Sequence, residues 1–155
     1  MTTSRTLLLA FLSLSASPGL APAASGEVDP AALYSISTDG SSKKVAAGEK
    51  AKLVIAIQTK PGAHVSDEAP LKVELSGVNA TPVKARLSHA DSVAKKAPGQ
   101  QFADPRFEAA FDAPKPGAAK MEAKVTVFIC TENLCNKYEQ TLSVPLEVTE
   151  KKKSL

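Results

Sequence analysis

The chain has 155 residues, with 19 basic and 16 acidic side chains and a formal net charge of +3. This near balance does not favour nucleic acid as a partner, and the length fits one folded domain. The sequence contains two cysteines, Cys130 and Cys135, which are the residues most able to take part in covalent chemistry.

The N-terminus has the pattern of a signal peptide. Arg5 gives a positive start, Leu7 to Leu14 is a short apolar run, and Ala21-Pro22-Ala23 fits an A-x-A cleavage site. We therefore predict a signal peptide over residues 1–23, whose removal lowers the net charge from +3 to +2. The apolar run is too short for a membrane-spanning helix. We expect an exported, periplasmic protein that is soluble after cleavage, without stable membrane insertion.

After the signal we expect a flexible lead-in over residues 24–32, one domain over 33–149 and a basic, solvated tail over 150–155. In the domain, apolar and polar residues alternate, which is typical of strands with one buried face. The alternating segments are Leu33–Thr38, the stretch around Val45, Leu53–Ile57, Leu71–Leu75, Val83–Leu87, Phe107–Phe111, Ala123–Ile129 and Leu142–Val148. They predict an all-β, immunoglobulin-like antiparallel sandwich of about seven or eight strands.

Between two of these segments, Ser88 to Pro105 has no sustained period. We predict a long surface loop with one helical turn near Ala90 to Lys96. Loops of this length are commonly functional or mobile. Phe107 and Phe111 follow at strand spacing, which indicates core positions.

The two cysteines flank a short loop, Thr131 to Leu134, between the last two alternating segments. If they face each other, the buried residues of one strand meet those of the other, as a shared core face requires. The expected pairs on that face are Ile129–Asn136, Val127–Tyr138, Val125–Gln140, Ala123–Leu142 and Met121–Val144. The other face pairs Phe128–Lys137, Thr126–Glu139 and Lys124–Thr141. This register predicts a cross-strand disulfide at a hairpin tip, pointing away from the main core.

Such a disulfide has two interpretations. A six-residue ring gains about 2 kcal/mol from loop closure, against about 4.7 kcal/mol for a ring of a hundred residues, so it is an inefficient staple. Near the cysteines, Lys137 and Glu132 have opposite effects on a thiolate, and no base is adjacent. An inert structural bond and a reactive pair suited to passive thiol exchange both stay open.

The cysteine block, Val125 to Val148, with its aromatic-x-Cys-x4-Cys pattern and the ending Ser143-Val144-Pro145-Leu146-Glu147-Val148, resembles the N-terminal periplasmic domain of the DsbD family of membrane thiol–disulfide reductases. The stretch Gly62 to Leu75 is similar to a second segment of that family. The resemblance implies an immunoglobulin-like fold with Cys130 and Cys135 as the redox-active pair. It also implies that His64 to Pro70 lies near the pair and acts as a cap.

By this resemblance the chain passes electrons between a membrane thiol reductase and periplasmic, thioredoxin-like partners through a Cys130–Cys135 disulfide. The chain departs from the family in its cysteine spacing, and its cap segment lacks a Phe or Tyr. The alternative is a non-enzymatic immunoglobulin-like binding or envelope-assembly module with a structural disulfide. His64, His89 and the cysteines lack metal-ligand spacing, so we expect neither metal nor cofactor.

Overall fold

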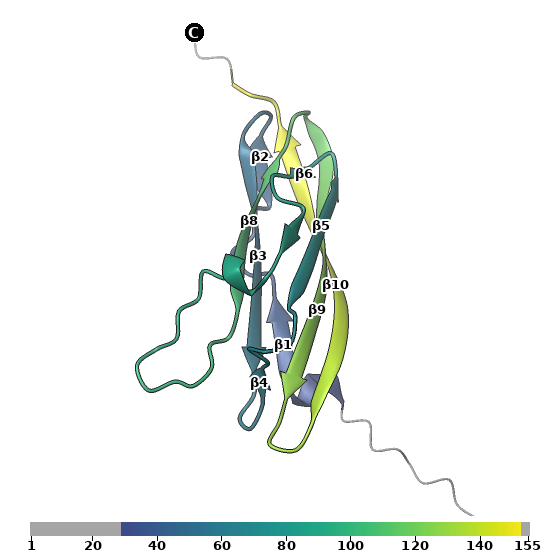
Figure 1. The fold of residues 1–155 in the computed structure, drawn as a ribbon. Coiled ribbons are helices and arrows are strands. Elements are labelled where there is room, and N and C mark those ends of the chain that lie inside the picture. Colours follow the sequence, from purple (N-terminus) through teal and green to yellow (C-terminus); the bar gives the residue numbers. More distant parts are fainter. Residues whose placement is uncertain (1–28, 153–155) are drawn as a thin grey trace, which may run out of the picture.

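The computed structural model describes residues 29–152, and the expected signal peptide, most of the lead-in and residues 153–155 lie outside this range. Within it the chain forms ten strands and two single 3-10 turns, without an α-helix (Figure 1). The strands make two sheets that pack face to face. The prediction of an all-β, immunoglobulin-like sandwich is confirmed, although the described residues form ten strands rather than about seven or eight.

The first sheet has four strands in the order β1-β3-β8-β6, all antiparallel. Their bounds are β1 Tyr34–Ser37, β3 Lys50–Thr59, β8 Arg106–Asp112 and β6 Thr81–Pro82. The second sheet follows the order β2-β10-β9-β5-β7, and β4 pairs with the free side of β9 at one end. Its bounds are β2 Lys44–Ala46, β10 Cys135–Thr149, β9 Gly117–Cys130, β5 Lys72–Val78, β7 Arg86–Leu87 and β4 His64–Val65.

The core lies between the two sheets. Phe107 and Phe111 of β8 are both 0% exposed, as their spacing predicts. Leu53 and Ile55 of β3 flank them in the same sheet, and Met121 of β9 is equally buried in the facing sheet. Alternate residues of each long strand thus fill one continuous apolar layer, which explains the period of two in the sequence.

The predicted strand Val83–Leu87 differs from the structure. The chain here divides into β6, in the first sheet, and β7, in the second sheet. Val83 donates to the carbonyl of Ala110 in β8, whereas the carbonyl of Ala85 accepts from Leu75 in β5. The segment therefore crosses between the sheets, and Val83 is 57% exposed despite its place in the alternating pattern.

The N-terminal strands make a similar crossing from the first sheet to the second. The chain leaves the first sheet after Ser37 and enters the second as β2, which pairs with β10 in parallel through Lys44 and Glu147. In the long loop, the helical turn occupies His89–Asp91, slightly before the expected position, because Ser88 and Asp91 form a capping box there. No helix among residues 29–152 is long and apolar enough to cross a membrane.

Candidate functional site

The cysteine hairpin has the register that the sequence predicts. Cys130 pairs with Cys135, and the pairing continues without interruption to Gly117 and Val148. Every expected pair on both faces is present. The two cysteines form a disulfide, with their Cα atoms 4.0 Å apart. The site is therefore the end of the longest hairpin in the described part of the chain (Figure 1).

The two halves of the disulfide differ in exposure. Cys130 is 3% exposed, whereas Cys135 is exposed to solvent. Neither belongs to the core cluster between the sheets, in agreement with a disulfide on the outer face. The sequence did not predict that Cys130 would nevertheless be covered.

Part of this cover is β4. His64 pairs with Cys130, Val65 pairs with Ile129, and the Ser66 amide donates to the carbonyl of Phe128 over 2.9 Å. Residues 64–70, which we call the cap segment, thus run beside β9 on the side away from β10. This is the segment that the family resemblance places near the cysteine pair. Backbone pairing with β9 brings the cap segment close to the cysteines, although the irregular sequence of the segment gives no sign of a strand.

An aromatic residue of the long loop packs on the cap segment. The ring of Phe102 stacks on His64, with ring centroids 3.8 Å apart and an interplanar angle of 11°. The cap segment contains no Phe or Tyr of its own, and Phe102 lies 38 positions after His64 in the chain. Only the fold brings the two rings together, although an isolated Phe in a polar loop is a usable signal.

Further contacts fasten the long loop to the cap segment and to β3. Lys96 Nζ lies 2.9 Å from Asp67 Oδ2, and His89 Nε2 lies 3.3 Å from the carbonyl oxygen of Ala69. Thr59 Oγ1 donates to Asp104 over 2.7 Å. The cap segment, the long loop and the hairpin tip therefore form one connected set of loops, which we call the loop end.

Charges next to the disulfide are paired with one another. Lys137 Nζ lies 2.8 Å from Glu139 Oε1, and Lys124 Nζ lies 3.4 Å from Glu139 Oε2. Hydrogen bonds from Lys137 and then Lys124 lower the pKa of the Glu139 carboxyl. Lys137 thus already has a carboxylate partner, while Glu132 lies exposed in the hairpin loop. This arrangement gives little local stabilisation of a thiolate at Cys135.

Of the two histidines, His64 lies beside the disulfide as the β4 partner of Cys130, and its ring stacks on Phe102. His89 is held near Ala69 instead. Residues 29–152 contain no group of three or more His, Cys, Asp or Glu side chains placed to hold a metal ion. The chemistry at the loop end is therefore that of a disulfide with one covered and one open half.

We expect Phe102→Ala to speed reduction of the disulfide by a small phosphine severalfold. Aromatic stacking contributes about 0.5–1.5 kcal/mol, and its loss raises the population of open cap conformers correspondingly. Thiol release followed by mass spectrometry measures the rate. Val93→Ala, a truncation at a 50% exposed position of the same loop, is the matched control. An unchanged rate in Phe102→Ala would show that the stack does not protect the disulfide.

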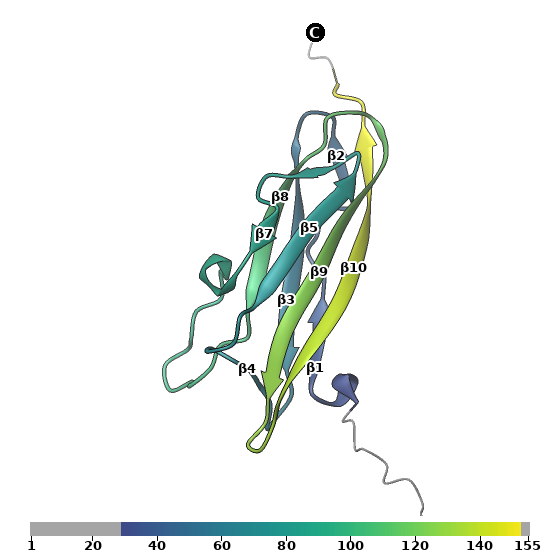
Figure 2. The same ribbon diagram turned by 45° about the vertical axis from the view of Figure 1, so that its right-hand side comes forward.

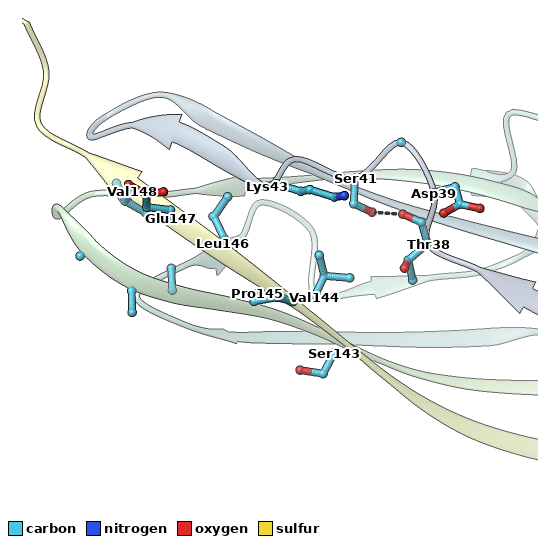
Figure 3. Close-up of a pocket in the computed structure, with 14 residues that line it drawn as sticks. Thr38, Asp39, Ser41, Lys43, Ser143, Val144, Pro145, Leu146, Glu147 and Val148 are labelled. Atoms are coloured by element: carbon cyan, nitrogen blue, oxygen red, sulfur yellow. Dashed lines mark hydrogen bonds between the residues drawn. The ribbon is translucent and has the colours of Figure 1, made fainter.

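A groove lies at a distance from the cysteines, between β10 and the segment that links β1 to β2. Its volume is about 820 Å³, and its lining includes Ser41, Lys43, Val144 and Leu146. Figure 3 shows Val144 and Leu146 pointing from β10 toward this linking segment, where Ser41 Oγ donates to the carbonyl of Thr38. The groove lies where the pairing between β2 and β10 ends.

The fold and the site together define a disulfide-bonded β-sandwich module. No family model matches the chain, and no curated protein matches it. Among solved structures, it is similar to domains 4 and 5 of the S-layer protein SbsC, with 14% identity and a TM-score of 0.38 over 76% of this chain and 52% of that one. It thus spans about half the length of that structure.

A second similar structure is the cohesin module from a family 33 glycoside hydrolase of Clostridium perfringens. The identity is 8% and the TM-score 0.42, over 77% of this chain and 97% of that module.

Proposed function

We propose that this chain is a non-enzymatic, exported immunoglobulin-like module that binds or assembles with other envelope proteins through its loop end. The disulfide then has a structural role: it pins the tip of the β9–β10 hairpin. An oxidising compartment, as export would provide, maintains such a bond.

One observation carries this proposal: three loops that are distant in sequence are fastened together at one end of the sandwich. The Phe102–His64 stack and the Lys96–Asp67 ion pair join two of them, and β4 joins them to the hairpin. Loops at the end of a sandwich are the usual binding surface of immunoglobulin-like domains. Loops that are already ordered lose less entropy on binding. Leu134, 52% exposed beside Cys135, supplies an apolar contact at the tip.

A thiol–disulfide exchange domain is the second candidate. The exposure of Cys135 favours it, because an external thiolate needs access to one sulfur of the bond. In that reaction the thiolate attacks one sulfur and forms a mixed disulfide, releasing the other cysteine as a thiolate. A second thiol of the partner then resolves the mixed disulfide, leaving this chain with two thiols and the partner oxidised. The resemblance to the DsbD family adds support.

The reduction potential of the Cys130–Cys135 bond, measured against glutathione, separates the two candidates. A potential below about −300 mV is typical of structural disulfides and is the result that we expect. A clearly higher potential, together with mixed disulfides trapped from periplasmic extract by Cys130→Ser or Cys135→Ser, would replace the binding proposal with thiol exchange.

The double variant Cys130→Ser/Cys135→Ser tests the structural role directly. We expect the free energy of unfolding to fall by about 2 kcal/mol, as the loop-closure model gives for this short ring. Co-purification from envelope fractions, with quantitative mass spectrometry, should recover the partners of the wild type. Leu134→Ser should reduce that recovery, whereas Val78→Ser, an exposed apolar site of β5 outside the loop end, should not. Recovery that depends on the cysteines and not on Leu134 would contradict the proposal.

A further inference from the structure

The outer edge of β10 is open over more than half of its length. β2 pairs with β10 at Glu147, Val148 and Thr149, and β9 occupies the opposite side of the strand throughout. From Cys135 to Ser143 the outer side of β10 has no strand partner among residues 29–152. Figure 2 shows β10 at the border of its sheet along this stretch.

The hydrogen bonds of the hairpin fix the direction of the backbone groups on this edge. The Thr131 amide donates to the carbonyl of Leu134, so the next pair, Cys130 and Cys135, makes no mutual backbone bonds. By alternation, odd-numbered residues of β10 direct their N–H and C=O groups outward. The outward bond from the Glu147 amide to the Lys43 carbonyl agrees with this. Lys137, Glu139 and Thr141 therefore present unused donors and acceptors.

The apolar side of the same stretch is incompletely covered. Residues of β10 nearer its C-terminus, such as Val144 and Leu146, are buried, but Tyr138 and Leu142 are only half-buried. Tyr138 contacts Tyr34 of β1, with ring centroids 5.3 Å apart, and its buried hydroxyl has no hydrogen-bond partner among the described residues. A further strand beside β10 would extend both the sheet and this apolar layer.

The charged side chains on this edge can pair with the same side chains of a second copy of the chain. We propose that two copies of this chain pair antiparallel through β10, around a two-fold axis at Tyr138, to form one continuous sheet. This register places Lys137 of each copy opposite Glu139 of the other, so the ion pair that these residues form within each chain meets its opposite charges across the interface. It brings Tyr138 next to its symmetry mate, on the apolar side.

Neighbouring registers lose this match. An axis at Lys137 sets two lysines opposite each other, and an axis at Glu139 sets two carboxylates opposite each other; both arrangements are unfavourable. Pairing around Tyr138 also ends before Glu147, where β2 already occupies the edge. The edge contact is small compared with standard interfaces, so a dissociation constant on the order of micromolar is expected. This interface lies along β10 and is additional to the loop end.

Sedimentation velocity of the disulfide-bonded chain, from low micromolar to near-millimolar concentration, tests the proposal. We expect a reversible monomer–dimer equilibrium. Lys137→Glu and Glu139→Lys should each raise the dissociation constant about tenfold or more, because each creates two like-charge pairs. The double variant Lys137→Glu/Glu139→Lys exchanges the charges and should restore dimerisation. Lys115→Glu, in the exposed turn before β9, changes the net charge equally and should have no effect.

Hydrogen exchange locates the interface independently of these variants. The amides of Lys137, Glu139 and Thr141 should exchange several times more slowly at high concentration, whereas amides of the loop end should not change. A chain that stays monomeric over the whole range, a dimer that leaves these three amides unprotected, or a double variant that fails to dimerise would each overturn the proposal.

Discussion

Replacing Phe107 with alanine is expected to lower the free energy of unfolding by about 3–5 kcal/mol. Phe107 is 0% exposed and lies in β8 opposite Ile55 of β3, so truncation removes a large apolar surface and leaves a cavity between the sheets. Because domains of this kind are stable by only about 5–15 kcal/mol in total, the variant should lose a large part of its stability. Urea denaturation followed by circular dichroism measures the change.

Phe102→Ala is the matched control, since it makes the same chemical change at a half-buried loop position. We expect it to cost less than about 1.5 kcal/mol, the contribution of one aromatic contact. Similar losses in the two variants would mean that the apolar layer between the sheets does not dominate the stability of this fold.

Gly77→Ala is expected to destabilise the chain by about 3 kcal/mol, although alanine ordinarily costs less entropy than glycine. A Cβ at Gly77 would lie 2.3 Å from the carbonyl oxygen of Ala80 and 2.7 Å from that of Lys120. Both atoms belong to the backbone, so relief requires β5 to move relative to β9 or the following turn to open. Thermal unfolding measured by calorimetry should show the loss as a lower melting temperature.

The neighbouring substitution Ser76→Ala provides the control, because Ser76 lies in the same strand and is exposed. Its expected effect is within about 0.5 kcal/mol of zero. A neutral or stabilising Gly77→Ala would contradict the close backbone approach at this turn.

The parts of the fold that the sequence predicts are those governed by the period of two. Phe107 and Phe111 follow it and are buried, and the hairpin register follows from matching two buried stripes. The pattern is wrong where hydrogen bonding overrides it. At Val83 the alternation continues, but the backbone bonds first to one sheet and then to the other, so this side chain is exposed.

At the candidate site, the sequence predicts the disulfide but not its environment. A two-residue strand such as β4 carries too few residues for any period to be visible. The stack of Phe102 on His64 depends on the path of the long loop, and polar loop sequences do not encode such a path by pattern. Tertiary contacts therefore decide which half of the disulfide is covered.

The pairing of β2 with β10 has a consequence for how the domain forms. It joins Lys44, near the beginning of the domain, to Glu147, near its end. Contacts between residues so distant in sequence form slowly, because a long loop must close first. During synthesis, β2 has no partner in its sheet until the last strand has emerged. β2 can therefore join its sheet only after β10 has been synthesised. A chain that ends before Glu147 would leave the second sheet without β2 as its edge strand.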